Sequence, residues 1–308
     1  MNAALPVTRR IPRLELIAIG GLVLVWSIGQ IFRERFWLTG LCFFIPSPLV
    51  AVVTFAAAFR YRWKRLFRQC RWALTLAVLP LLAIVALENH WTAPQAAMSG
   101  PKTIRLVHWN VWHGNLGRPG VGAVLAEYNA DICVLSEPPE TIDFATIDQQ
   151  SGTENSTVRI GDMTVIAIGT LTREATFPIG DGYGGLLLWH NKDQTISLLA
   201  ADLPSRITAA RGPMLLELQR RIEEHHPDIV VGDLNSPRRC LGLANLPRGY
   251  VHAYDTAGKG WSCTWPVICP LWAIDHCVTG PRIRSLHYGL RSTTASDHRL
   301  QCLDFEVD

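Results

Sequence analysis

The sequence lacks the short motifs that mark several large classes of enzyme. It contains no His-Glu-x-x-His run and no Cys-x-x-Cys pair, which argues against the common zinc sites. No glycine-rich loop ends in Lys-Ser or Lys-Thr, so a P-loop nucleoside triphosphatase is not expected. Eight cysteines in 308 residues are too few for a disulfide-based scaffold, and no repeat of fixed period is visible.

Charged residues are also scarce. They make up 18% of the chain, hydrophobic residues make up 48%, and the mean hydropathy is +0.15. This composition excludes intrinsic disorder and is typical of a chain with a membrane part. Residues 1–100 hold 11 Lys/Arg against 3 Asp/Glu, a net charge of +8, whereas residues 101–308 hold 18 against 23, a net charge of −5. The last two thirds therefore lack the basic excess expected of a broad face for duplex DNA.

Three apolar runs in residues 1–88 predict membrane-spanning helices. They are Leu14–Phe32, Trp37–Phe59 and Trp72–Leu87. A helix needs about 20 apolar residues to cross a bilayer, so the first two runs fit well and the third is short. Pro46 and Pro48 predict a kink or a partly unwound turn inside the second run. A cleaved signal peptide fits less well, because the first run is long, has no small-residue cleavage site and is followed by further runs.

The positions of Lys and Arg predict the orientation of these spans. Three arginines precede the first run: Arg9, Arg10 and Arg13. The segment Arg60–Arg71, between the second and third runs, holds six positive charges in twelve residues. Such flanks are expected in the cytoplasm, so three spans in the inner membrane would put the following domain in the periplasm. Arg33 and Arg35 argue mildly against this orientation, and two spans would leave the domain in the cytoplasm.

The rest of the chain predicts a linker and one α/β domain. Residues 89–102 are punctuated by Pro, Ala, Ser and Gly, as in a linker, and the domain covers residues 103–308. Its runs of strand length are Ile104–Val111, Ile132–Leu135, Thr164–Ile168, Gly185–Trp189, Ile196–Ala200, Ile229–Val231 and Ala273–Val278, and its helical segments are Val121–Tyr128 and Pro213–Ile222. Many strands with few helices predict a four-layer sandwich of two packed β-sheets flanked by helices.

Five clusters of polar residues occur at the ends of predicted strands. Their chemistry-bearing residues are Asn110, Glu137 before two prolines, Asp233 with Asn235, Asp275 before His276, and Asp297 with His298. Alternation puts Asp233 and Asn235 on the same side of an extended segment. Each cluster alone has a simpler explanation, such as a turn or a surface charge. The functional interpretation depends on the five together, in this order, each following an apolar strand.

This order of motifs resembles the endonuclease/exonuclease/phosphatase superfamily, which includes pancreatic deoxyribonuclease, apurinic endonucleases, bacterial sphingomyelinases and inositol polyphosphate phosphatases. The resemblance covers residues 103–308 and is closest to a bacterial branch in which several membrane spans precede the domain. Thr264-Trp265-Pro266, and Leu203-Pro204-Ser205 with Arg211, also look like that branch. The resemblance implies metal-assisted attack of water on a phosphodiester or a phosphomonoester.

The resemblance also implies a metal site. Glu137 and Asn110 would hold Mg²⁺, with Mn²⁺ as the alternative ion, because carboxylate and amide oxygens are the hard ligands that these ions prefer. Asp297 would support the metal side of the site. The metal would in turn hold the crowded carboxylates ionised.

The same resemblance implies the proton chemistry. Asp233 would orient or deprotonate the attacking water, and Asn235 would hydrogen-bond the phosphoryl oxygens. His298 would act as a general base or as a proton donor to phosphate, and Asp275 would fix its tautomer and raise its basicity.

One position departs from the pattern. Members of the superfamily usually carry a His at the end of a middle strand, where this chain has Asp202. An ionised Asp would repel the substrate, so Asp202 is a protonated donor, an extra metal ligand or a sign of weakened catalysis. His108 or His113 could substitute from the first loop.

Several alternatives stay open. The substrate is a lipid-linked or small phosphodiester, which fits membrane anchoring better, or a nucleic acid, which the domain's net charge of −5 disfavours. A second hypothesis is a binding or sensing protein that keeps the fold without catalysis, and Asp202 is the residue that supports it. A transporter or receptor is disfavoured, because the spans hold no buried charge pair. Cys263 and Cys269 are spaced so that a disulfide could form if the domain is extracytoplasmic.

Overall fold

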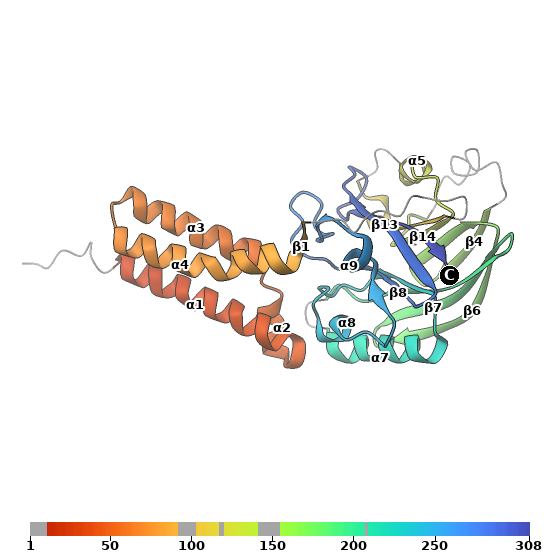
Figure 1. Ribbon diagram of the computed structural model, residues 1–308, viewed down its shortest axis with the longest axis horizontal. Coiled ribbons are helices and arrows are strands. Elements are labelled where there is room, and N and C mark those ends of the chain that lie inside the picture. The colour runs from red at the N-terminus through yellow and green to blue at the C-terminus, as the bar shows by residue number, and fades with distance from the viewer. Residues whose placement is uncertain (1–10, 92–102, 117–119, 141–154, 207–208) are drawn as a thin grey trace, which may run out of the picture. The chain divides into compact units, whose positions relative to one another are not determined.

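The computed structural model describes residues 11–91, 103–116, 120–140, 155–206 and 209–308 (Figure 1). The chain divides into two compact units, Met1–Asn89 and His90–Asp308. Two arginines of the predicted cytoplasmic flank, Arg9 and Arg10, lie outside the described residues, and so do residues 92–102 of the predicted linker.

The described part of the N-terminal unit is helical. Its elements are α1 (Ile11–Phe32), η2 (Arg33–Arg35), α2 (Trp37–Phe43), α3 (Ser47–Trp63), α4 (Phe67–Ala83) and the π-helical turn η3 (Ile84–Glu88). The stretches Arg13–Arg35 and Phe67–Glu88 are each long and apolar enough to cross a membrane. The third predicted run, which was expected to begin at Trp72, is therefore long enough to span. Its helix, α4, already begins five residues earlier, at Phe67.

The second predicted run is broken. Helices α2 and α3 are bent by 63° relative to one another, and together they are long and apolar enough for one broken span or a re-entrant loop. Pro46 precedes α3 and Pro48 lies in its first turn, where the missing N–H group is tolerated, although neither proline could continue α2. The kink predicted from these prolines is confirmed.

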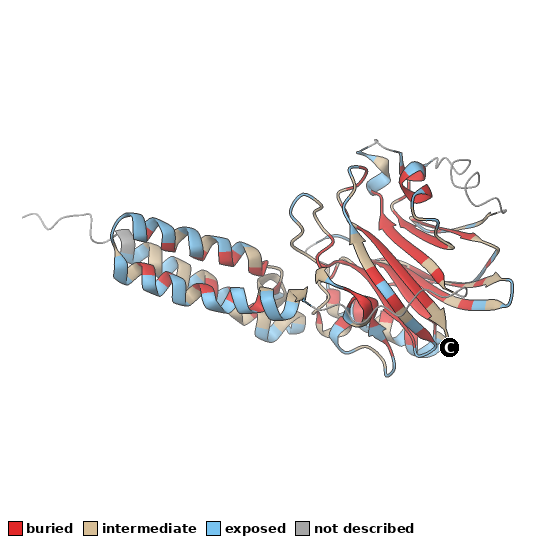
Figure 2. Cartoon of the chain, turned by 45° about the horizontal axis from the view of Figure 1, so that its top comes forward, coloured by how far each residue is buried: buried red, intermediate tan, exposed pale blue. Residues whose placement is uncertain are grey.

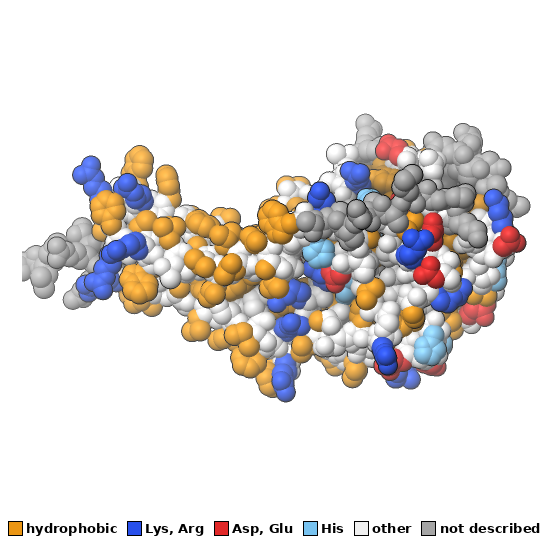
Figure 3. Space-filling view, viewed as in Figure 1, with side chains coloured by type: hydrophobic (Ala, Val, Ile, Leu, Met, Phe, Trp, Pro, Cys, Tyr) orange, Lys and Arg blue, Asp and Glu red, His pale blue; other side chains and the backbone are white. Residues whose placement is uncertain are grey.

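The N-terminal unit packs as a helical bundle with an apolar outer surface. Val23 and Trp26 of α1, Val50 of α3 and Ala83 of α4 form one buried cluster. At the bundle end, Arg60 of α3 donates a 2.8 Å hydrogen bond to Glu15 of α1. Figure 3 shows hydrophobic side chains over the flanks of this unit, with Lys and Arg gathered toward its ends.

The C-terminal unit contains two six-stranded mixed sheets, packed face to face (Figure 1). In the order β13-β14-β2-β3-β5-β4, the first holds β2 (Ile104–Asn110), β3 (Ile132–Ser136), β4 (Asn155–Ile160), β5 (Met163–Ile168), β13 (Ile283–Arg291) and β14 (Leu300–Val307). In the order β10-β12-β9-β8-β7-β6, the second holds β6 (Thr170–Ile179), β7 (Gly182–Asn191), β8 (Gln194–Asp202), β9 (Ile229–Asp233), β10 (Val251–His252) and β12 (Asp275–Thr279).

Helices cover the outer faces of the two sheets. The remaining elements are β1 (Asn89–His90), η4 (Trp112–Gly114), α5 (Val121–Ala126), α7 (Arg211–His225), α8 (Leu241–Ala244), α9 (Ala253–Ala257) and β11 (Gly260–Trp261). Buried residues gather along the strands (Figure 2). Residues of α5 pack with the first sheet, and α7 buries Met214, Leu215, Leu218 and Ile222. The predicted architecture of two packed sheets with flanking helices is confirmed.

The strand order brings the polar strand ends together. In the first sheet, β2 and β3 are parallel, so that Asn110 lies beside Ser136, the residue before Glu137. In the second sheet, β8 and β9 are parallel, and β12 runs antiparallel to β9 with Asp275 opposite Asp233. Each sheet therefore supplies polar groups to the candidate site.

Candidate active site

Asn110 joins the two sheets. It ends β2 and is 1% exposed, and its Nδ2 donates to Glu137 Oε1 at 3.2 Å and to Asp233 Oδ2 at 2.9 Å. Its Oδ1, the atom predicted to face a metal, accepts a 2.9 Å hydrogen bond from the backbone N–H of Trp112. One buried amide thus holds a carboxylate from each side of the sandwich.

Glu137 directly follows β3 and has left-handed backbone geometry, with φ of +49°. Its N–H donates to the carbonyl of Asp162 at 2.9 Å, and its own carbonyl accepts from the N–H of His113 at 2.7 Å. Its Oε2 lies 3.5 Å from His113 Nε2. Because a non-glycine residue rarely adopts this conformation, the two backbone bonds hold Glu137 in a strained position that leaves its carboxylate partly exposed.

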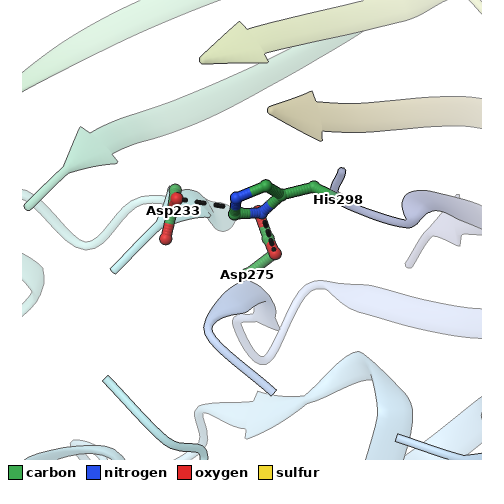
Figure 4. Close-up of side chains that lie close together, drawn as sticks. All are labelled: Asp233, Asp275 and His298. Carbon is green, nitrogen blue, oxygen red and sulfur yellow. Dashed lines mark hydrogen bonds and ion pairs between the residues drawn. The ribbon is translucent and has the colours of Figure 1, made fainter. Parts of the chain in front are cut away.

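The buried centre of the site is formed by His298, Asp275 and Asp233 (Figure 4). His298 Nδ1 donates to Asp275 Oδ2 at 2.9 Å and lies 4.0 Å from Asp233 Oδ2. One ligand atom from each residue falls within 4.8 Å of the other two. Asp233 Oδ1 accepts from the N–H of Asn235 at 2.9 Å, which fixes the orientation of that carboxylate.

Mutual electrostatics set the charge states of these three groups. Burial lowers the pKa of His298, but Asp275, Asp233 and Asp297 outweigh burial and raise it to about 9. Burial raises the pKa of Asp275, but His298 brings it below its ordinary value on balance. Burial and the Asp275 carboxylate raise the pKa of Asp233 to about 7. At neutral pH the site therefore holds a charged His298–Asp275 pair beside a carboxyl group that titrates near neutrality.

Asp297 flanks the imidazole on its other side. Its Oδ2 accepts a 2.8 Å hydrogen bond from Trp265 Nε1, and its Oδ1 lies 4.0 Å from His298 Nε2. That Oδ1 is buried and has no hydrogen-bond partner within the described ranges, and the same holds for Asp275 Oδ1. Buried carboxylate oxygens without partners are costly, so each favours a ligand or cation that would contact it.

Asp202 ends β8 near the same carboxylates. Burial, followed by the charges of Asp233 and Glu137, raises the pKa of Asp202 to about 9. The side chain is therefore neutral at pH 7 and carries a proton that it can donate.

The loop after Asp202 contacts the two other predicted residues. Asn235, which has a φ of +45°, donates from Nδ2 to the carbonyl of Leu203 at 2.8 Å. Arg211 is 5% exposed, and its guanidinium donates to the carbonyls of Pro204 and Arg206. Arg211 therefore shapes the loop that supports Asn235.

The two predicted substitute histidines differ sharply. His108 is fully buried, with Nε2 3.3 Å from Ser136 Oγ, and burial lowers its pKa to about 4. His113 is half exposed beside Glu137. Of the two, His113 is the one that solvent and substrate can reach.

Sequence reasoning missed the supporting roles of three residues. Thr264 Oγ1 accepts from the N–H of Asp275 at 3.2 Å, and Trp265 holds Asp297. Ser296 Oγ accepts from the N–H of His298 at 3.0 Å and donates to the carbonyl of Asn110 at 2.6 Å. The Thr264-Trp265-Pro266 motif had marked Thr264 and Trp265 as part of the family resemblance, but their roles could not be predicted from it.

Comparisons with known proteins identify the family and the fold. The model of the Endonuclease/Exonuclease/phosphatase family matches residues 107–298, more than half of the chain. No curated protein matches the sequence. Enzymes of this family are typically dependent on divalent metals, and the site has the acidic groups that such an ion requires.

Solved structures share the fold. TDP2 of D. rerio, crystallised with a single-strand DNA product, is 15% identical with a TM-score of 0.53, covering 67% of this chain and 99% of that one. The endonuclease/exonuclease/phosphatase from Bacteroides vulgatus gives the same four values. Truncated TDP2 of Caenorhabditis elegans is 17% identical with a TM-score of 0.50, covering 67% and 98%. The chain belongs to the endonuclease/exonuclease/phosphatase family and is a hydrolase of phosphate esters.

Proposed function

We propose that the protein is a membrane-anchored, Mg²⁺-dependent phosphoesterase that cleaves a phosphodiester, or a phosphomonoester, by attack of water. The observation that carries the proposal is the buried His298–Asp275 pair, 2.9 Å apart, beside Asp233 in a chain of this family. The substrate is a lipid-linked or small phosphodiester, or a nucleic acid. The net charge of −5 over residues 101–308 favours the first two.

The donor set fits a hard divalent cation. Glu137 would be the main ligand, with Asn110 and Asp297 completing the metal side, and Mn²⁺ could replace Mg²⁺. The buried, unpartnered Oδ1 of Asp297 supports this assignment. When bound, the cation would neutralise charge on the phosphoryl oxygens.

The chain's own residues would move the protons. Asp233, with a pKa of about 7, would accept a proton from the attacking water while Asn110 holds its Oδ2 in place. His298, whose Nδ1 is engaged by Asp275, would use Nε2 to donate to a phosphoryl or leaving-group oxygen. Asn235 retains a second amide hydrogen that can reach the substrate.

A neutral Asp202 would take the place of the family's usual His. Its pKa of about 9 means that it would donate a hydrogen bond to a phosphoryl oxygen rather than repel the substrate. A neutral donor at this position would weaken the main argument for a binding or sensing protein with reduced catalysis, which remains the alternative.

The N-terminal helices would anchor the enzyme in the inner membrane, as in the bacterial branch that the sequence resembles. The Arg60–Glu15 bond joins the end of α3 to the start of α1, which supports antiparallel crossings by these helices. The basic segment 60–71 would then lie in the cytoplasm, and α4 would lead the domain to the periplasm. Labelling of Leu216→Cys, an exposed position on α7, by an impermeant thiol reagent in intact spheroplasts tests this in a Cys269→Ser chain. Labelling only after lysis would put the domain in the cytoplasm.

The activity test uses the full chain in detergent. A chromogenic phosphodiester and a chromogenic phosphomonoester are offered with Mg²⁺ or with chelator. We expect metal-dependent turnover that falls on the order of 10²-fold or more in His298→Ala and is kept in His287→Ala, a half-exposed histidine on β13. Equal turnover in both variants would overturn the proposal. A folded, metal-binding chain without turnover would favour the binding protein.

A further inference from the structure

The loop between β11 and β12 presents an apolar surface. The thirteen residues Ser262–Ile274 carry no charged side chain. Ile268 is 95% exposed, and its neighbour Cys269 is also exposed. Partly exposed apolar residues flank them in the chain: Val267, Pro270, Leu271 and Trp272. An apolar patch of this kind marks a surface for an apolar partner.

The loop is held in one shape by its own hydrogen bonds. The N–H of Trp272 and the carbonyl of Trp265 are 3.0 Å apart, as are the N–H of Trp265 and the carbonyl of Trp272. The N–H of Cys269 donates to the carbonyl of Pro266 at 3.1 Å. Trp261 Nε1 donates to the carbonyl of Pro270 at 2.8 Å. A fixed turn, rather than a loose loop, therefore exposes Ile268.

The same loop is bonded to the candidate active site. The N–H of Val267 donates to the carbonyl of Asp297 at 2.6 Å, and Trp265 Nε1 donates to the Asp297 carboxylate. The ring of Trp265 lies 6.3 Å from that of His298. A partner that covers the loop would therefore lie beside the candidate active site.

The course of the chain favours a lipid bilayer as that partner. The candidate span Phe67–Glu88 ends two residues before His90, a stretch of about 7 Å at most. His90 stacks on Tyr254 with ring centroids 4.4 Å apart, and its N–H donates to Tyr254 Oη at 3.0 Å. Tyr254 Oη donates to the carbonyl of Gly260, which begins β11 and so leads into the loop. The chain thus tethers the base of the loop to the end of a candidate span.

We propose that the loop Ser262–Ile274 inserts its tip, Ile268 and Cys269, into the interfacial layer of the bilayer, and that the enzyme therefore acts on the phosphoesters of membrane lipids. The inference rests on the proposed function and narrows its substrate. The apolar tip contacts the acyl region, while the site beside it meets the headgroup phosphate.

The first experiment measures the depth of the loop in the full chain, reconstituted in vesicles of phosphatidylcholine and phosphatidylglycerol. An environment-sensitive thiol dye is attached to Cys269, and Cys269→Ser gives the background from the other cysteines. The control is Leu216→Cys in the Cys269→Ser chain, because Leu216 is an exposed apolar residue of α7. We expect blue-shifted emission and quenching by acyl-brominated lipid at Cys269 alone. Equal emission and quenching at both positions would overturn insertion.

The second experiment separates insertion from chemistry. Ile268→Asp should lose on the order of tenfold or more turnover on vesicle phospholipid and keep turnover on a soluble phosphodiester, whereas Leu216→Asp should keep both. An equal effect of Ile268→Asp on both substrates contradicts the inference. If the wild type cleaved the soluble ester and did not cleave the vesicle phospholipid, the proposal of a lipid substrate would be overturned. The proposed phosphoesterase activity would still hold. Undiminished turnover in His298→Ala would instead overturn the proposed function.

Discussion

Asp233 and Asp275 lie directly opposite one another on the antiparallel strands β9 and β12, and both are buried. Like charges at opposed positions repel, so this arrangement persists because His298 bonds to Asp275 and lies 4.0 Å from Asp233. The register of β9 against β12 therefore places two carboxyl groups next to the His298 imidazole, and these groups raise its pKa.

We expect Asp275→Asn to lower both the turnover and the pKa of His298, because it removes the carboxylate that raises that pKa most. Turnover should fall on the order of 10²-fold. The alkaline limb of the pH–rate profile should also move to lower pH. Asp193→Asn, in an exposed turn, is the control. An unmoved limb would show that Asp275 does not set the basicity of His298.

Asp202→Asn should stabilise the protein increasingly as pH rises. The folded pKa of about 9 exceeds the ordinary value of 3.8, so the folded state binds the extra proton between these values and wild-type stability falls with rising pH across that window. Asparagine cannot ionise, so it removes the loss of stability that Asp202 causes as pH rises. Its side-chain amide can still donate a hydrogen bond. The measurement is the thermal midpoint of both chains at pH 5 and pH 8 in chelator. If Asp202→Asn raised the thermal midpoint by the same amount at both pH values, this would contradict a raised pKa for Asp202.

The same variant distinguishes the roles proposed for Asp202. If Asp202 is a neutral donor, Asp202→Asn should keep most turnover and Asp202→Ala should lose it. If Asp202 is a metal ligand, both variants should need more Mg²⁺ for half-maximal rate. The Mg²⁺ dependence of turnover in the three chains decides between them.

Glu137→Gln should weaken metal binding, because a neutral amide replaces the charged ligand. We expect a 10–100-fold rise in the Mg²⁺ concentration that gives half-maximal turnover. Mn²⁺ should also raise the thermal midpoint of the wild type more than that of the variant. Glu140→Gln, three residues along the chain and exposed, should behave as the wild type. Unchanged metal dependence in Glu137→Gln would remove this residue from the metal site.

Arg211→Lys should destabilise the domain by about 1–3 kcal/mol, because lysine lacks the fork that donates to the carbonyls of both Pro204 and Arg206. Arg220→Lys on the same helix is the matched control, since its side chain is exposed and its surface ion pairs with Glu217 and Glu224 stabilise the fold little. Denaturant midpoints of the three chains measure the difference. Equal losses would mean that burial of Arg211 does not matter.

The strands that sequence predicted are those with a buried, apolar centre. β2, β3, β8 and β9 each match an apolar run, because both of their faces are covered. The edge strands β4, β6 and β13 were not predicted, since edges mix polar and apolar residues. β14 was missed although it is central, because it carries Asp304, whose carboxylate pairs with Arg105.

The site residues were predictable as a set because strand ends converge in a layered fold. Their contacts were not. Whether the Asn110 amide turns its nitrogen or its oxygen to the carboxylates depends on the backbone of Trp112, and the bond from Trp265 to Asp297 depends on a loop without periodicity. Arg211 was singled out without an assigned role, because position in the sequence does not reveal that its partners are carbonyls.

The first sheet takes β2–β5 from one part of the chain and β13 and β14 from another, so two fragments of this enzyme would have to rebuild that sheet to form the site. A cut after Gly169, between β5 and β6, leaves Asn110 and Glu137 in one fragment and Asp233, Asp275 and His298 in the other. Neither fragment holds a complete set of reacting groups, so phosphoester cleavage in a mixture would require that the halves reassemble. Two such fragments would form a split reporter, in which phosphoester cleavage is the signal that the fragments have associated.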